Sequence, residues 1–334
     1  MIINYYDIRP RAHKLAAVSI IIGGRGIGKT YSSISFMLEQ DRPFIYLRNT
    51  AVQMDESASV FGNPFKKVSK DLGRDIRLEA EKKHYVINEY LENGEKKLLG
   101  YGAALSTFGN LRGVDLSDAG YCLFDEFIER RTLSFNQWDN FQQFYETVNR
   151  NRELEGEEPF KCILLSNSQT LQNDILQGYG LVNRIIGMKE RGEHLYREPG
   201  LYLELPESEV SDLKAKTANY RLIAGTDTAL ESLSNEFAYD SFTRVKKQPI
   251  REYMPVCMAG DPGGSGSVCF YRHKSSGGLY VSQTPNMNCK IYDKEMYTLF
   301  MRERGLALRE LIVQGRVYYE DYNSKIISDH LFKL

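Results

Sequence analysis

Residues 18–30 read VSIIIGGRGIGKT and join a short apolar run to a glycine-rich turn. The run at 18–22 is rich in β-branched residues, which is typical of a buried strand. The eight residues that follow match G-x-x-x-x-G-K-[ST], the phosphate-binding loop that connects a strand to a helix. The stretch therefore predicts a nucleotide-binding turn, and a glycine-rich turn without a ligand is the alternative.

The residue types of this loop fit the chemistry of a phosphate site. Glycines let backbone N–H groups turn toward an anion, and the start of the following helix adds its positive dipole end. Lys29 can reach the β- and γ-phosphates, and the Thr30 hydroxyl can ligate Mg²⁺. The candidate nucleotide-binding residues are Gly23, Gly24, Arg25, Gly26, Ile27, Gly28, Lys29 and Thr30.

The segments after the loop predict an α/β fold. Residues 31–40 have apolar side chains at helical spacing, and residues 44–49, FIYLRN, read as a second buried strand. A helix and a strand after a phosphate-loop strand begin a parallel α/β sheet. Residues 83–90 and 96–103 are predicted to form a hairpin insertion around a Glu-Asn-Gly turn.

Two later strands end in polar residues. Residues 121–127, YCLFDEF, end in Asp125 and Glu126. Ligands of α/β sheets bind at the carboxyl ends of strands, so Asp125 is suited to hold Mg²⁺ and Glu126 to polarise an attacking water. Residues 161–167, KCILLSN, end in Asn167, which either senses the γ-phosphate or caps a turn.

Composition and charge narrow the class of protein. The chain has 334 residues, 42% hydrophobic and 26% charged, with a net charge of −1, which is ordinary for a globular protein and excludes a uniformly basic nucleic-acid coat. Five cysteines without a C-x-x-C pattern predict reduced thiols in a cytosolic protein. The polar, charged N-terminal stretch is not expected to act as a signal peptide, and no apolar run approaches the ~20 residues of a membrane span.

Two features leave alternatives open. The interval 66–83 holds seven Lys or Arg residues against four acids, so it is either a solvated face or a contact for DNA phosphates. The lysines considered for DNA contact are Lys66, Lys67 and Lys70. Tyr5 and Tyr6 precede the first strand and either stack on a nucleobase or pack in the core.

Three motifs follow one another along the chain: the loop with Arg25 inside it, the run LFDEFI at 123–128, and RNRE at 150–153. In this combination and order the chain resembles the phi29-type phage DNA-packaging ATPases, which are relatives of the large terminase motors. The resemblance runs from the first strand to about Leu205. It implies a P-loop NTPase of the additional-strand (ASCE) type with a parallel β-sheet core, using ATP and Mg²⁺. It further implies a homo-oligomeric ring, a pentamer, that docks on the prohead portal and moves double-stranded DNA inward, with prohead structural RNA as a partner. Such a motor works in the host cytoplasm during virion assembly and involves no membrane.

The same resemblance assigns roles to individual residues. Lys29 and Thr30 match the phosphate and Mg²⁺ positions, Arg25 the basic residue inside the loop, and Asp125 and Glu126 the Mg²⁺ and catalytic acids.

Three further residues are assigned by the resemblance. Asn167 falls at the coupling or sensor strand. Arg150 matches the arginine finger offered to a neighbouring subunit, although local pairing with Glu146 one turn earlier is the alternative. Arg112 matches a second basic residue near the subunit interface.

The C-terminal part suggests a second domain. The predicted divisions are a P-loop ATPase domain at 1–206, a linker subdomain at 207–247 with a helix at 237–247, and an RNase H-like α+β domain at 248–334.

In that last domain, Asp261 and the pair Glu320-Asp321 are similar to the acids of terminase nucleases. Two-metal cleavage needs about three or four clustered carboxylates, and Asp329 is only a weak substitute for the last one. The nuclease is therefore predicted to be vestigial.

Two other functions are alternatives to a packaging ATPase. One is a terminase large subunit whose C-terminal nuclease still cuts DNA. The other is a GTPase switch, which the sequence argues against because it contains no N-K-x-D motif for guanine and its D-x-x-G, at 261–264, lies far from the phosphate loop.

Overall fold

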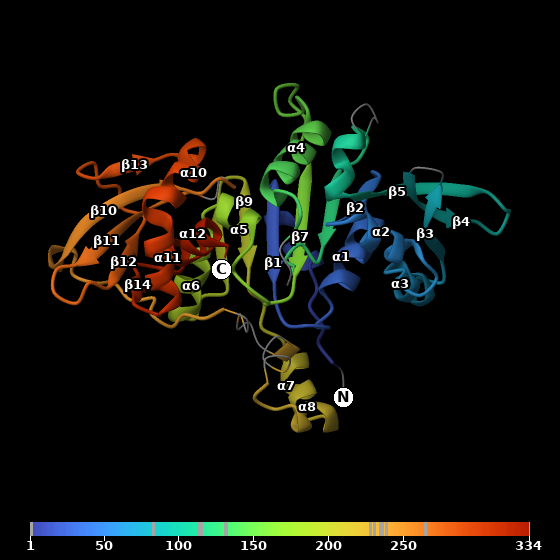
Figure 1. Cartoon of the computed structure of the whole chain (residues 1–334). Helices are drawn as coiled ribbons and strands as arrows, with labels where there is room; N and C mark the ends of the chain where they lie inside the picture. Colours follow the sequence, from blue (N-terminus) through green and yellow to red (C-terminus); the bar gives the residue numbers. More distant parts are fainter. Residues whose placement is uncertain are drawn as a thin grey trace. The chain divides into compact units, whose positions relative to one another are not determined.

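Figure 1 shows the computed structural model of the chain, which describes residues 3–81, 84–111, 116–129, 133–226, 229, 232–233, 237, 240–263 and 266–333. The chain forms two compact units, one made of Met1–Thr170 with Met188–Tyr239 and the other of Leu171–Gly187 with Asp240–Leu334. This partition differs from the divisions expected from the sequence. Most of the expected linker subdomain belongs to the first unit, and Leu171–Gly187 belongs to the second.

The first unit is built on a nine-stranded sheet with the order β3-β4-β5-β2-β6-β7-β1-β9-β8. Its central strands β2, β5, β6, β7, β1 and β9 pair in parallel. The strands are β1 (Val18–Ile22), β2 (Phe44–Arg48), β3 (Asp75–Glu81), β4 (His84–Tyr90), β5 (Lys96–Ala104), β6 (Tyr121–Asp125), β7 (Lys161–Ser166), β8 (Leu195–Glu198) and β9 (Leu201–Glu204). The predicted α/β architecture with a parallel-rich sheet is confirmed.

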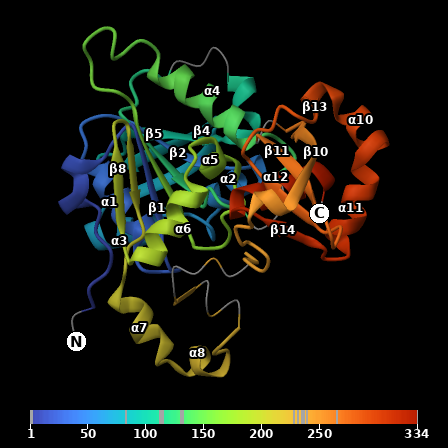
Figure 2. The ribbon, with the colours of Figure 1, turned by 90° about the vertical axis from the view of Figure 1, so that its left-hand side faces the viewer.

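The first unit also contains helices. They are η1 (Arg9–Lys14), α1 (Lys29–Leu38), α2 (Ala51–Ala58), α3 (Phe65–Leu72), η2 (Leu105–Leu111), α4 (Gln137–Asn149), α7 (Glu209–Ala215) and α8 (Ala218–Leu222), together with the end of α6 (Val182–Arg191). Both views show α4 at one end of the sheet and α7 and α8 at the other (Figure 1, Figure 2).

The predicted hairpin insertion is part of the main sheet instead. β4 and β5 do pair antiparallel, but β5 also pairs in parallel with β2, from Phe44 opposite Gly100 to Arg48 opposite Ala104. β3 extends the hairpin on its other side. Local patterning identifies a hairpin because its two strands are close in sequence, whereas the long-range β2–β5 pairing leaves no local signal.

A buried carboxylate fastens the N-terminal segment to the sheet. Glu204 on β9 accepts hydrogen bonds from the hydroxyls of Tyr6 (2.9 Å) and Tyr202 (2.7 Å), and Arg11 Nε lies 2.8 Å from its other oxygen. The backbone N–H of Tyr6 also donates to the Ile27 carbonyl in the phosphate loop (2.8 Å). The segment before β1 is therefore fixed against the loop.

The second unit contains a five-stranded sheet with the order β13-β10-β11-β12-β14. The strands are β10 (Tyr253–Gly260), β11 (Ser267–His273), β12 (Leu279–Ser282), β13 (Lys290–Tyr292) and β14 (Val317–Tyr319). The helical elements are α5 (Asp174–Gly178), the start of α6, η3 (Ile250–Glu252), η4 (Lys294–Met296), α10 (Tyr297–Phe300), the π-helical turn η5 (Met301–Gly305), α11 (Leu306–Val313) and α12 (Tyr322–Phe332).

The helix expected at 237–247 is absent from the described part of that stretch. Residues 240–247 form a turn and a single parallel bridge between Val245 and Tyr319. The backbone of Lys246 donates to the Tyr319 carbonyl, so pairing with β14 replaces the helical hydrogen bonds.

Among the described residues, none of the helices combines the length and apolar character that a membrane crossing requires.

Candidate nucleotide-binding site

The phosphate loop joins β1 to α1 as predicted. Gly26 (φ +70°) and Gly28 (φ +107°) adopt left-handed backbone conformations that favour glycine. Lys29 is buried, and its Nζ donates to the carbonyls of Gly23 and Gly24 (2.8 Å each) and to Asn167 Oδ1 (3.3 Å). The loop, its lysine and the predicted sensor residue are therefore brought together.

The electrostatic setting of Lys29 favours a bound anion. Burial lowers the pKa of Lys29 to about 8, the negative charge of Asp125 opposes this shift, and the positive charge of Lys214 reinforces it. An anion in the loop would stabilise the ammonium form, since opposite charge raises the pKa of a lysine.

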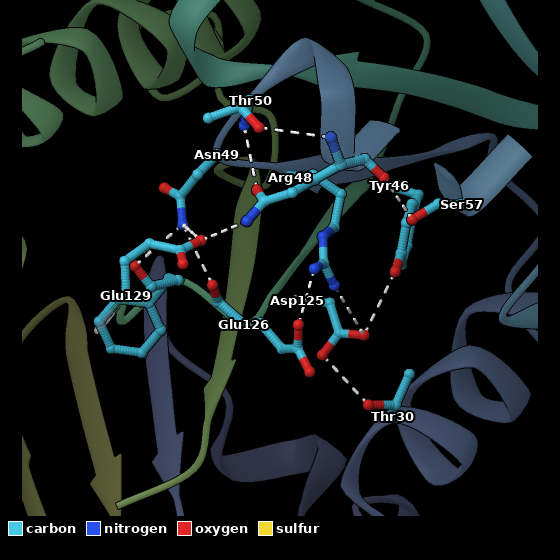
Figure 3. Close-up of polar contacts among 11 residues, drawn as sticks. Thr30, Tyr46, Arg48, Asn49, Thr50, Ser57, Asp125, Glu126 and Glu129 are labelled. Atoms are coloured by element: carbon cyan, nitrogen blue, oxygen red, sulfur yellow. Dashed lines mark hydrogen bonds and ion pairs between the residues drawn. The ribbon is translucent and has the colours of Figure 1, made fainter. Parts of the chain in front are cut away.

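Thr30 and Asp125 face one another at the carboxyl edge of the sheet. Thr30 Oγ1 donates to Asp125 Oδ1 (3.1 Å), and the Tyr46 hydroxyl donates to Asp125 Oδ2 (3.2 Å), as Figure 3 shows. Burial raises the pKa of Asp125, while the nearby Arg48 cation lowers it. A hydroxyl and a carboxylate are hard oxygen ligands of the kind that Mg²⁺ prefers.

Arg48 is a site residue that the sequence did not reveal. It ends β2, its side chain is only 12% exposed, and its Nη2 lies 2.7 Å from Glu126 Oε2 and its Nη1 3.8 Å from Asp125 Oδ2. Figure 3 shows this guanidinium between the two acids. The sequence does place Arg48 at the carboxyl end of a predicted buried strand. Ligands of α/β sheets bind at that edge, so this position could have indicated a site residue.

Glu126 has an unusual backbone. Its φ is +53°, a conformation that costs energy in a residue other than glycine and is concentrated at functional sites. The amide of Asn49 donates to the carbonyls of Glu126 (3.1 Å) and Phe127 (3.2 Å) and to the Glu129 carboxylate (2.9 Å). Gln137 Nε2 in turn donates to Asn49 Oδ1 (2.6 Å). These bonds hold the backbone that follows the Asp-Glu pair (Figure 3).

A cavity of about 560 Å³ opens over the loop. It is lined by Tyr5, Arg25, Gly26, Gly28, Lys29, Thr30, Tyr31, Lys67, Asp71, Asp125, Glu126, Ser166 and Asn167. The volume falls within the range of small-molecule sites. Loop, acids and sensor residue thus border one space.

The cavity also distinguishes between residues that the sequence left ambiguous. Tyr6 is 7% exposed and packs in the core, whereas Tyr5 is 57% exposed and lines the cavity. Lys67, considered for DNA contact, lines the same cavity, where its Nζ lies 3.0 Å from Asp71 and 5.6 Å from the centre of the Tyr31 ring. Lys66 and Lys70 are exposed on α3, and their contact with DNA remains a prediction.

The structure describes one of the two arginines predicted to act near a subunit interface. Arg112 lies outside the described residues. Arg150 is exposed, has a φ of +49° and directly follows α4. The preceding Asn149 accepts a hydrogen bond from the Phe160 N–H just before β7, so Arg150 lies at the edge of the sheet where β7 begins, opposite the carboxyl edge that carries the cavity.

The neighbouring Arg152 has a structural role. It is 5% exposed, its Nη2 donates to the carbonyls of Ser117 (2.6 Å) and Ala119 (2.7 Å), and its guanidinium lies over the Phe160 ring.

The acids of the second unit are engaged separately. The Asp261 carboxylate lies 3.8 Å from His330 Nδ1, and Glu320 accepts a hydrogen bond from the Ser282 hydroxyl. Asp321 caps α12 through the Ser324 N–H (2.7 Å). Within the described ranges, no three His, Cys, Asp or Glu side chains are arranged to hold a metal ion.

The chain is similar in sequence to phage DNA-packaging proteins. Residues 4–321 match the family model described as Podovirus DNA encapsidation protein (Gp16). The chain is 28% identical over 239 residues to the DNA packaging protein of Bacillus phage B103, covering 69% of this chain and 67% of that protein. It is 27% identical over 239 residues to the DNA packaging protein of Bacillus phage phi29, covering 69% and 65%. The matched region thus spans about two thirds of these curated relatives.

Solved structures extend the likeness to the whole chain. The fold resembles a chain of "The Phi-28 gp11 DNA packaging Motor" with a TM-score of 0.66 at 19% identity, covering 99% of this chain and 98% of that one. It resembles a chain of "The bacteriophage Phi-29 viral genome packaging motor assembly" with a TM-score of 0.66 at 22% identity, covering 98% of both. Phosphate loop, Asp-Glu strand, family match and whole-chain fold agree, and the chain belongs to the Podovirus DNA encapsidation protein (Gp16) family.

Proposed function

We propose that this chain is the ATP-hydrolysing subunit of a motor that drives double-stranded DNA into a preformed phage prohead. The observation that carries the proposal is the single cavity that Lys29, Thr30, Asp125, Glu126 and Asn167 border, in a chain of the DNA encapsidation family. A packaging motor must couple nucleotide hydrolysis to movement, and these are the residue types that hydrolysis of a phosphoanhydride requires.

The phosphate loop would hold the nucleotide. Backbone N–H groups from Gly23 to Thr30 and the positive end of α1 receive the phosphates, and the Lys29 ammonium neutralises their charge. Tyr5 and Tyr31 also line the cavity and are suited to contact the base and sugar. The exposed ring of Tyr5 offers a stacking face for adenine.

Mg²⁺ fits between two residues of this site. Thr30 Oγ1 and Asp125 Oδ1, 3.1 Å apart, would hold it directly or through water. When bound, the ion would neutralise charge on the β- and γ-phosphates. Asp125 must be ionised for this role, and the Arg48 cation favours its charged form.

Glu126 is the candidate for the group that orients and polarises the attacking water. In the structure its carboxylate accepts a hydrogen bond from Arg48. A carboxylate oxygen that accepts from a guanidinium is occupied by that donor and is not positioned for the attacking water. We infer that Glu126 leaves Arg48 to act, so that Arg48 restrains hydrolysis until the ring is engaged on DNA.

Arg150 is proposed as a finger that acts on a neighbouring subunit. Its place at the edge of the sheet opposite its own cavity argues against action on its own nucleotide and suits a ring in which one subunit's rim meets the next subunit's cavity. Asn167 would sense the γ-phosphate through its contact with Lys29. Arg112 remains a candidate second interface residue.

The strand order supports the additional-strand class of P-loop ATPase. β7 lies between the phosphate-loop strand β1 and the Asp-Glu strand β6, and Asn167 directly follows its end.

We further propose that the chain forms a pentameric ring on the prohead portal, with prohead structural RNA as a partner. Its C-terminal nuclease-like domain would no longer cut DNA. The ring would act in the host cytoplasm during virion assembly.

ATP hydrolysis by the full chain, with and without double-stranded DNA and proheads, tests the proposal. We expect DNA and proheads to stimulate hydrolysis, and Lys29→Ala to reduce it by about 10²-fold or more because the phosphoryl group loses its cation. Lys97→Ala is the matched control, since Lys97 is exposed on β5 away from the cavity. Hydrolysis at the wild-type rate in Lys29→Ala would contradict the assigned site.

A further inference from the structure

Helix α7 packs directly on the phosphate loop although no sequence motif links the two. Ser211 and Lys214 are three residues apart and so share one face of α7. A Cβ built on Gly24 would lie 3.2 Å from Ser211 Oγ, and one built on Gly26 would lie 2.7 Å from Lys214 Nζ. The glycines of the loop therefore make room for α7 as well as for an anion.

Lys214 contributes an ammonium group to this contact. Its Nζ donates to the Arg25 carbonyl at the tip of the loop. A lysine has three donors, and among the described residues Arg25 is the acceptor that Lys214 meets. A neutral carbonyl is a weaker partner for an ammonium than a phosphate oxygen, because the phosphate adds the attraction between two opposite charges.

Two lysines consequently converge on one loop. Lys29 approaches it from α1 and Lys214 from α7, and the charge of Lys214 is felt at Lys29, where it disfavours the ammonium form. Like charges held this close destabilise each other unless an anion lies between or beside them. The arrangement thus suits a ligand with several negative charges, as a nucleotide polyphosphate has.

We propose that Lys214 is a second phosphate-binding lysine of the site, which α7 supplies to the polyphosphate of the bound nucleotide from the side of Arg25 and Gly26. The inference rests on the proposed binding of nucleotide by the loop. A lysine side chain has a flexible four-carbon stem, so Nζ can exchange the Arg25 carbonyl for a phosphate oxygen without movement of the helix. Nucleotide bound in this way ties α7, the first helix after β9, to the loop.

Binding of ADP and of the slowly hydrolysed analogue AMP-PNP to the full chain, measured by calorimetry, tests this. We expect Lys214→Gln to weaken both about tenfold and Lys214→Arg, which keeps the charge and reach, to remain within about threefold of wild type. Lys216→Gln is the matched control, because Lys216 is an exposed lysine at the end of the same helix. Thermal unfolding without nucleotide should be the same for all variants, since Lys214 is a partly exposed surface residue.

Hydrogen exchange at α7 gives a second readout that a loss of packing alone would not produce. AMP-PNP should slow amide exchange in α7 of the wild type and of Lys216→Gln, and should not slow it in Lys214→Gln. If Lys214→Gln binds nucleotide as tightly as the wild type or more tightly, the inference is wrong. If Lys29→Ala abolishes binding in the same experiment, the proposed nucleotide site itself is still supported. Absence of nucleotide binding by the wild type would overturn both the inference and the proposed function.

Discussion

Arg48 Nη2 lies 2.7 Å from Glu126 Oε2, so a largely buried guanidinium at the end of β2 holds the candidate catalytic carboxylate at the end of β6. The same guanidinium lies 3.8 Å from Asp125. Since β2 and β6 are neighbours in the sheet, one cation is in contact with both acids that the proposed hydrolysis needs. The state of this contact would therefore determine whether the Glu126 carboxylate is available to contact the attacking water.

Replacing Arg48 tests this restraint. Arg48→Gln should lower the ratio of DNA-stimulated to basal ATP hydrolysis by about fivefold or more, because Glu126 no longer needs DNA to be released. Both rates are measured in the same preparation, so the ratio does not depend on the active fraction. Arg42→Gln, which changes a half-exposed arginine away from the cavity, should leave the ratio unchanged. An unchanged ratio in Arg48→Gln would show that the contact has no regulatory role.

The lowered pKa of Lys29 predicts how nucleotide affinity depends on pH. Burial lowers this pKa to about 8, and bound phosphates raise it again by favouring the ammonium. Above pH 8 the free chain must then take up a proton to bind, so affinity should be constant below about pH 8 and fall by up to about tenfold per pH unit above it.

ADP affinity between about pH 7 and about pH 9.5 measures this effect, because the phosphates of ADP titrate below that range. Lys29→Arg is the control, since a guanidinium keeps its charge throughout. Its affinity, whatever its absolute value, should not vary with pH. A flat profile for the wild type would mean that Lys29 stays fully charged in the free chain.

Mixed rings test the proposed role of Arg150. A finger supplied in trans is worth about 10³–10⁵ in turnover, so Arg150→Ala should be nearly inactive alone. Lys29→Ala should also be inactive alone, but it retains the finger. Mixing the two inactive variants should restore part of the ATP hydrolysis, because some interfaces then join an intact loop to an intact finger. If no mixture recovers activity, Arg150 acts within its own subunit or only on structure.

The C-terminal unit is predicted not to cleave DNA. Asp261 follows β10 and Glu320 follows β14, and β11 and β12 lie between these strands. Neighbouring strands are about 4.8 Å apart, so the two strand ends are separated by about 14 Å, too far for one pair of metal ions ~4 Å apart. Incubation of plasmid with the full chain and Mg²⁺ or Mn²⁺ should leave it intact. Nicking that disappears in Asp261→Asn would instead favour the terminase function.

The parts of the site that could be predicted from the sequence are those encoded in short contiguous runs. The phosphate loop needs adjacent glycines before Lys29 and Thr30, and Asp125 and Glu126 stand together at the end of one apolar run. In a parallel sheet, the ends of such runs meet at one edge, so Asn167 could also be expected there. The structure brings these residues to one cavity.

The parts that could not be predicted depend on long-range neighbours. Arg48 contacts Glu126 because β2 and β6 pair, and strand order is not written in either strand. Lys214 reaches the loop from a short polar helix that resembles a linker when read alone. Tyr5 and Tyr6 are adjacent and alike in type, and the buried carboxylate of Glu204, 198 residues after Tyr6, accepts a hydrogen bond from the hydroxyl of Tyr6 alone of the two.

DNA packaging into purified proheads is the most direct test of the proposed motor. The measured quantity is the fraction of added double-stranded DNA that becomes resistant to nuclease when the full chain, proheads and ATP are present. We predict that the wild type protects DNA only with ATP, and that Glu126→Gln, which keeps the size of the side chain and loses its basicity, binds nucleotide but protects none. Protection without ATP, or undiminished protection by Glu126→Gln, would contradict the claim that hydrolysis at this site drives the DNA.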